Sequence, residues 1–205
     1  MDDRLDLMDQ GSFLGLRALG HQPCTYLTWV YDRPVDLGEL GRFNECLART
    51  LLGRLVQRSA LPGGRHRWVA IDAVPSVEVE SVARPREAIQ PWTDELGERG
   101  VDPERGPGWR LGVLPLTDGG TAVTLATGHT LGDGLAKLEA IADAVRGTVR
   151  RPDHPVRGTT RRRDALWSDL VALVRGLPAV LRAVVVAIMV ARAESGPKRP
   201  GQRRS

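Results

Sequence analysis

The stretch GHTLGDG, residues 128 to 134, places a histidine four residues before an Asp-Gly pair. An imidazole with an ordinary pKa of about 6.5 can accept a proton at neutral pH, which makes His129 a candidate base. If a helix begins after Asp133, its carboxylate can accept hydrogen bonds from free backbone N–H groups, and Gly134 has no Cβ to obstruct a tight joint. The same residues could also end a strand and cap a helix without any chemistry.

The elements on either side of this stretch can be read from its apolar pattern. Two strand candidates, 109–116 and 121–128, are separated by a short turn that contains Asp118-Gly119, a strong hairpin signal. After His129 the apolar period changes from two to about 3.6, which predicts a helix from about 134 to 146. The residues that indicate this helix are Leu135, Leu138, Ile141, Ala142 and Val145. The motif therefore joins a strand to a helix.

Earlier segments supply the rest of a mixed fold. Residues 25–32 are rich in β-branched and aromatic types, as strands are. Asp36 and Glu39 have capping-box spacing and predict the start of a helix. The remaining expected elements are a partly helical segment at 5–19, strands at 65–71 and 76–83, and a short helix at 87–99. Together they predict an α/β fold, a two-layer sandwich of a mixed, mostly antiparallel sheet with covering helices.

The length of 205 residues favours one domain with extra elements. Residues 1–146 are expected to form the subdomain that carries the motif. An Arg/Pro-rich stretch, 147–163, reads as a linker, and 164–194 as a pair of helices divided by a proline. The basic end of the chain, 195–205, is expected to be disordered.

Charge is distributed unevenly along the chain. Residues 1–145 carry 15 basic and 21 acidic side chains, whereas residues 146–205 carry 14 and 4. A basic third can indicate nucleic-acid binding, but these arginines lie in segments broken by proline and glycine. No set of stacking aromatics, helix-turn-helix or zinc pattern accompanies them. Nucleic acid is therefore not the expected partner.

The sequence points to a cytoplasmic protein. Its acidic start, MDDRLDLMDQ, lacks the basic and apolar regions of a signal peptide. The longest apolar run, 183–191, has nine residues, whereas a membrane-spanning helix needs about 20. The helix around it, 178–193, still leaves open a contact with a membrane surface. Cys24 and Cys46 are too few for a disulfide scaffold and are expected to be reduced.

Other residues that could do chemistry lack a supporting pattern. His21, His66 and His154 have no metal-ligand spacing, so no metal site is expected. Ser12 and Ser59 do not lie in a nucleophile elbow, and no glycine-rich phosphate loop is present. Serine hydrolases and nucleotide-binding proteins are therefore excluded.

The run GPGWRLGVLPLTDGGTAVTLATGHTLGDG resembles the segment that leads into the HxxxDG motif of the chloramphenicol-acetyltransferase-like superfamily. That superfamily includes condensation domains, plant-type acyltransferases and wax ester synthase/diacylglycerol acyltransferases. The earlier stretch TYLTWVYDRPVDLGELGRFNECLARTLLGRL is similar to the N-terminal half of the wax-ester-synthase and condensation-like branch. The chain is thus identified as the N-terminal half of such an acyltransferase.

The resemblance implies a reaction and a role for each motif residue. His129 would be the general base that takes a proton from an acceptor alcohol or amine. The acceptor would then attack an acyl thioester on CoA or a carrier protein, which is a co-substrate, and no bound cofactor is implied. Asp133 and Gly134 would support the motif structurally, and in this family the aspartate is usually paired with an arginine. The candidate arginines are Arg110, Arg54 and Arg58.

Two departures from the family pattern leave alternatives open. Many members have a second histidine where this chain has Gly128, and family enzymes of this branch have about twice this length. The chain could be one part of a split or truncated protein, which is the favoured interpretation. It could also be a homo-oligomer whose neighbour completes the site, or a non-catalytic remnant. As a binding or assembly module, its basic C-terminal third would contact a partner or a membrane.

Overall fold

A computed structural model describes residues 3–20, 24–148 and 154–156, together with short runs and single positions between 166 and 189. The described residues between 166 and 189 are helical. The expected division into a linker, a helical pair and a basic tail falls largely outside the described residues and stays a prediction.

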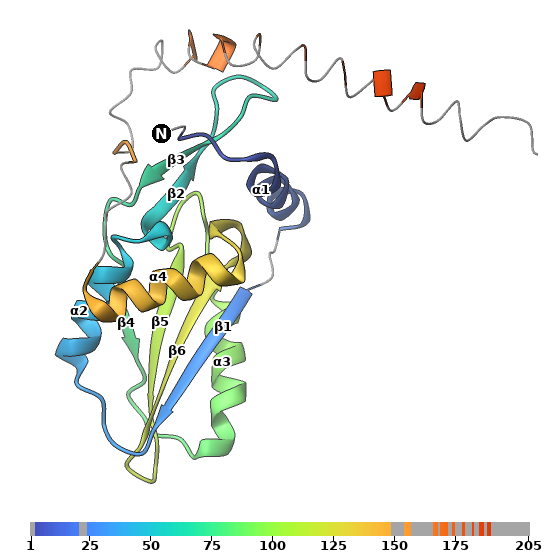
Figure 1. Ribbon diagram of the computed structural model, residues 1–205. Coiled ribbons are helices and arrows are strands. Elements are labelled where there is room, and N and C mark those ends of the chain that lie inside the picture. Colours follow the sequence, from blue (N-terminus) through green and yellow to red (C-terminus); the bar gives the residue numbers. More distant parts are fainter. Residues whose placement is uncertain are drawn as a thin grey trace, which may run out of the picture.

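A four-stranded sheet forms the centre of the described chain, in the order β1-β6-β5-β4 (Figure 1). Its strands are β1 (Cys24–Tyr31), β4 (Val77–Val79), β5 (Trp109–Pro115) and β6 (Thr121–Gly128). The β1/β6 and β6/β5 pairs are antiparallel, whereas β5 and β4 are parallel. The mixed, mostly antiparallel sheet with covering helices is confirmed.

Helices cover both faces of this sheet (Figure 1). The helices are α2 (Leu37–Leu47), α3 (Ile89–Glu98) and α4 (Gly134–Arg146). Because strand side chains alternate between faces, Val123 and Leu125 pack in the core under α2 and α4, whereas Ala122 packs against Trp92 of α3. All eight residues of β6 are buried, so the strand before the motif is a rigid support.

A smaller unit lies beside the end of the sheet where the motif is found (Figure 1). It consists of α1 (Leu7–Leu19), the single-turn helix η1 (Leu51–Gly53) and the antiparallel strands β2 (Arg54–Gln57) and β3 (Arg67–Ala70). Later segments of the chain contact it. The Pro155 carbonyl accepts a hydrogen bond from the Ala70 N–H at 3.0 Å, and the buried Asp169 accepts one from Ser59 Oγ at 2.6 Å.

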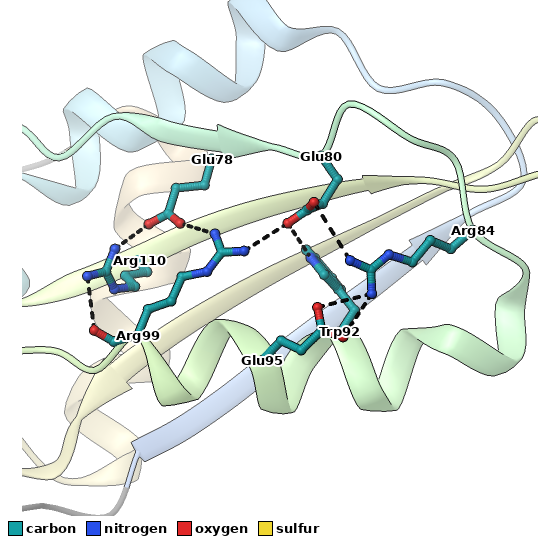
Figure 2. A network of polar contacts seen from close by, with 7 residues as sticks. All are labelled: Glu78, Glu80, Arg84, Trp92, Glu95, Arg99 and Arg110. Atoms are coloured by element: carbon teal, nitrogen blue, oxygen red, sulfur yellow. Dashed lines mark hydrogen bonds and ion pairs between the residues drawn. The ribbon is translucent and has the colours of Figure 1, made fainter.

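An ion-pair network joins α3 to the β4 side of the sheet (Figure 2). Arg110 Nη1 donates to Glu78 Oε1 at 2.6 Å, and Arg99 donates to Glu78 and Glu80 at 2.6 and 3.1 Å. Burial opposes the charged form of Glu78, but the hydrogen bonds from Arg110 and Arg99 outweigh it and hold its pKa below the ordinary value. Arg84 Nη1 donates a hydrogen bond to the Glu95 carboxylate at 3.0 Å. Three acidic and three basic side chains therefore balance each other at this edge.

The expected positions of the main elements are confirmed. Helix α4 has the bounds expected from the sequence. Of the residues that indicated this helix, Leu135, Leu138 and Val145 are exposed, whereas Ile141 is buried. The buried residues of α4 are Lys137, Ala140, Ile141 and Ala144. The stripe that packs on the core therefore includes a lysine.

Candidate functional site

The motif forms a short connection between the end of β6 and the start of α4. His129, Thr130 and Leu131 make a single helical turn, η3 (His129–Leu131), directly after Gly128. The Leu131 side chain is fully buried and fixes this turn in the core. Gly132 then has a φ of 148°, which favours glycine strongly. The chain thus reverses between a buried strand and a helix within a few residues.

The His129 side chain is exposed at the end of this rigid strand. Among the residues that the structure describes, none forms a hydrogen bond or an ion pair with its imidazole. The imidazole therefore lies on the surface of the described part of the chain.

Asp133 occupies the N-cap position of α4. Its Oδ1 accepts a hydrogen bond from the Ala136 N–H at 2.8 Å, which satisfies one of the free donors at the helix start. Gly134 follows it, and an added Cβ there would meet nothing within 4 Å. The expected steric need for a glycine is therefore not found at Gly134. The conformational need lies two residues earlier, at Gly132.

The three candidate arginines have other partners in the structure. Arg110 belongs to the network around Glu78, and Arg58 forms an ion pair with Glu104 at 2.9 Å. Arg54 comes nearest to the motif, because its Nη2 donates to the Leu131 carbonyl at 3.0 Å. Within the described chain, none of the three contacts the Asp133 carboxylate. That carboxylate is turned toward the start of its own helix instead, so the expected ion pair is not formed.

Arg54 nevertheless supports the motif loop through the backbone. Its guanidinium stacks on Trp68 of β3, 3.7 Å from the ring centroid, and lies 4.0 Å from the Asp9 carboxylate. Burial lowers the pKa of this guanidinium, and the charge of Asp9 works against that effect. The hydrogen bond to Leu131 thus connects the motif turn to the small β2–β3 unit.

Lys137 is a buried residue near the motif that the sequence interpretation missed. Its side chain is only 1% exposed, and its Nζ lies 3.2 Å from Oγ1 of Thr25 at the start of β1. Burial lowers the pKa of this lysine, although the nearby Cys24 and Asp133 counteract the effect. Burial also raises the pKa of the Cys24 thiol. The spacing of Lys137 from Ile141 and Ala144 could have revealed its position on the buried stripe.

A groove beside α2 and the end of α4 lies away from the motif histidine. It has a volume of about 910 Å³ and is lined by Trp29 and Tyr31 of β1, by α2, and by the C-terminal end of α4. Since His129 follows the other end of β6, the groove does not reach it. Neither this groove nor the two smaller hollows beside α2 and α4 are lined by His129.

The described residues contain neither a metal-binding cluster nor a membrane-spanning helix. No group of three or more His, Cys, Asp or Glu side chains there could hold a metal ion. Among the same residues, no helix is long and apolar enough to cross a membrane.

Comparisons with known proteins give matches among solved structures. No family model and no curated protein matches the chain. The starter condensation domain of the rhizomide synthetase RzmA matches with a TM-score of 0.58 and 17% identity, over 71% of this chain and 36% of that one. The first condensation domain of the calcium-dependent antibiotic synthetase, in complex with substrate analogue 2a, gives 0.56 and 17%, over 75% and 40%. The chain has a condensation-domain fold.

The condensation-domain fold is the chloramphenicol-acetyltransferase-like fold that the resemblance implied. The chain spans 35–41% of the length of the RzmA and calcium-dependent antibiotic synthetase chains, so it covers about one half of that fold. A mutant RzmA starter domain in complex with C8-CoA also matches, with a TM-score of 0.54 and 15% identity over 73% of this chain and 37% of that one. Identities this low establish the shared fold alone.

Proposed function

We propose that this chain is the motif-bearing half of an acyltransferase. It would move an acyl group from a thioester of CoA or of a carrier protein to an alcohol or an amine. The observation that carries the proposal is the exposed His129 imidazole at the end of the buried strand β6, in a condensation-domain fold. The complex of a similar domain with C8-CoA supports an acyl thioester as the donor.

The proposed reaction uses His129 as a general base. Its free ring nitrogen takes the proton from the acceptor hydroxyl or amine as the acceptor oxygen or nitrogen bonds to the thioester carbonyl carbon. The carbon–sulfur bond then breaks, and the imidazolium returns the proton to the leaving sulfur. An acyl ester or amide and a free thiol result. General-base catalysis of this kind is typically worth about 10² to 10⁴ in rate.

The remaining motif residues would hold the histidine in place without transferring protons. Asp133 fixes the start of α4 through its hydrogen bond to the Ala136 N–H. Arg54 holds the turn through the Leu131 carbonyl. Positioning matters because a small displacement of a base relative to two bound substrates can reduce the rate considerably.

The exposed position of His129 also indicates what this half lacks. A reaction of this type benefits from a site that excludes water and holds both substrates. The described chain provides only one side of such a site. We therefore propose that activity needs a second surface, either the other half of the fold or a second copy of this chain.

A thiol-release assay tests the proposal. The chain is mixed with a long-chain acyl-CoA and a long-chain alcohol or amine, alone and with the product of any adjacent gene, and free CoA is measured. We expect release that requires both substrates and falls about 10²- to 10⁴-fold in His129→Ala. The control, His21→Ala, should retain full activity.

Either of two results would contradict the proposal. If His129→Ala retains the measured activity, His129 is not the general base. If no thiol is released under any of these conditions although acyl-CoA binds, the chain is a binding or assembly module.

A further inference from the structure

Lys137 carries a charge at a position where charge opposes folding. Its side chain is 1% exposed and belongs to the buried stripe of α4. Within the described chain its Nζ has one acceptor, Thr25 Oγ1 at 3.2 Å, although an ammonium carries three donors. No described carboxylate forms an ion pair with it, and the nearby Asp133 carboxylate binds the start of its own helix. Burial of an ammonium whose partner is a hydroxyl costs free energy.

An apolar side chain of similar length would fill the same space without this cost. Methionine is unbranched, like the stem of a lysine, and adapts well to irregular core space. Replacement of a buried charged group by a hydrophobic one of similar volume is often neutral or stabilising. Packing alone therefore does not account for a lysine at position 137. The property that methionine would lack is the hydrogen bond from the ammonium to Thr25.

The hydrogen bond from Lys137 connects to the motif through the start of β1. Thr25 lies opposite Thr127 in the β1/β6 pair, and the Thr25 carbonyl accepts a hydrogen bond from Thr127 Oγ1 at 3.5 Å. Thr127 is two residues before His129. In the first turn of α4, the Lys137 N–H donates to the Asp133 carbonyl at 3.1 Å. Lys137 thus joins the strands before the motif turn to the helix after it (Figure 1).

We propose that Lys137 is a positioning residue for His129. Its buried ammonium fixes the start of α4 against the start of β1, so that the turn between β6 and α4 keeps one geometry. A hydrogen bond is directional, whereas an apolar contact at the same place would let the helix shift along the strand. Arg54 holds the same turn from the β2–β3 unit, through the Leu131 carbonyl. The turn is therefore held from two sides, and the buried charge serves position rather than stability.

The kinetic consequence of this role rests on the proposed acyl transfer, whereas the structural consequence does not. The Lys137 side chain is buried and does not touch a substrate. Its loss should displace His129 without removing a contact to the acyl donor or to the acceptor. The kcat of acyl transfer should therefore fall by up to about 10²-fold, because a small displacement of a base is costly. The KM of each substrate should keep its native value.

Lys137→Met in the full chain tests this role without any substrate. Hydrogen exchange, measured by mass spectrometry, reports how often the motif turn opens. We expect the amides of residues 128–133 to exchange about tenfold faster, because a hydrogen bond from a charged donor contributes on the order of that factor. The amides of β5 should exchange at the native rate. The urea midpoint of unfolding should equal or exceed the native value, because a buried charge has been removed.

Thr25→Val is the matched variant of the partner residue. It removes the hydroxyl and leaves the ammonium buried without that acceptor, so it should both speed exchange at the motif and lower the urea midpoint. Combining Thr25→Val with Lys137→Met should restore the urea midpoint but not the slow exchange. The control is Leu138→Met, at the next position of α4, where the native side chain is exposed. It should change neither quantity.

Native exchange at residues 128–133 in Lys137→Met would overturn the positioning role. A urea midpoint that falls as it does for the loss of an ordinary core side chain would make Lys137 a stability residue, and would overturn the role too. In the thiol-release assay, a lower kcat with a native KM supports the role, whereas a native kcat overturns it. A native chain that releases no thiol contradicts only the proposed acyl transfer, since exchange and the urea midpoint still decide the role of Lys137.

Discussion

The β4 and β1 edges of the central sheet differ in length and charge. β4 has three residues, and the acidic side chains on and beside it pair with arginines of β5 and α3 (Figure 2). β1 has eight residues and no charge, and its outer side has no strand partner in the described chain. Neither edge strand has a strand partner on its outer side in the described chain, but the acidic side chains at β4 are paired with arginines. The two edges therefore differ in length and in charge.

The two features singled out at the surface lie on the β1 side of the sheet. The motif histidine follows β6 at its end beside the start of β1, and the apolar groove lies at the other end of the same strand pair. Both therefore lie on the β1 half of the sheet.

Replacement of a buried tryptophan on the β4 side of the sheet should have the largest effect on the free energy of unfolding. Trp92 of α3 is fully buried beneath the network, so Trp92→Ala should reduce the free energy of unfolding by about 4 kcal/mol. Trp29 of β1 is only partly buried, and Trp29→Ala should cost less than half as much. Urea denaturation of both variants measures the difference. Equal losses would contradict the contrast between the two edges.

Loss of a network carboxylate should be the next largest effect. Glu78→Gln removes the charged partner of Arg110 and of Arg99, and should reduce the free energy of unfolding by about 2 kcal/mol. The matched control is Glu39→Gln, which breaks the exposed pair with Arg42 and should produce no measurable change. Both variants can be compared by chemical denaturation at neutral pH.

Two motif residues are expected to have different roles, Asp133 in stability and His129 in catalysis. Asp133→Ala removes the helix cap and should cost about 1 kcal/mol. His129→Ala removes an exposed side chain with no described partner and should leave the melting temperature unchanged. Differential scanning calorimetry distinguishes the two. A large loss of stability in His129→Ala would mean that the histidine is part of the packing after all.

Acid should reduce the stability that Glu78 contributes at the β4 edge, by less than the substitutions above do. The pKa of Glu78 is held below its ordinary value of 4.5 in the folded chain, so its contribution to stability is present above that value. It is lost as the pH falls through the lower, folded-state pKa. The free energy of unfolding should therefore decrease as the pH falls from about 5 to about 3, and Glu78→Gln should show a smaller decrease. A variant with the same pH dependence as the native chain would contradict this role.

Local signals made much of the fold predictable. Asp36 caps α2, and a hairpin joins β5 to β6, because capping and turn residues act over only a few positions. The parallel pairing of β4 with β5, in which Val77 lies opposite Leu111, was not predicted. These residues are far apart in the sequence, and their contact depends on tertiary packing rather than on local signals. The strand β2 was also missed, because its four residues follow a helical apolar period without a break.

The site was predictable in position but not in its contacts. The strand-to-helix joint at His129 follows from the change of period alone. The sequence indicated helix α4 but not its buried face, because apolar residues occur on two of its sides and the buried side includes Lys137. A long lysine stem can pack as an apolar side chain while its ammonium reaches a hydroxyl, so its charge conceals its burial. The arginine contacts depend on distant elements and could not be read from spacing.

The pairing of β1 with β6 also has a consequence for how the chain folds. Thr28 lies opposite Thr124, 96 residues later in the sequence. At ordinary rates of synthesis, β1 would leave the ribosome roughly 5 to 20 s before β6 exists. During that interval both edges of an uncharged strand are unsatisfied, and contacts this distant form slowly. The nascent chain is therefore most prone to aggregate in the interval after β1 has been synthesised and before β6 is available to pair with it.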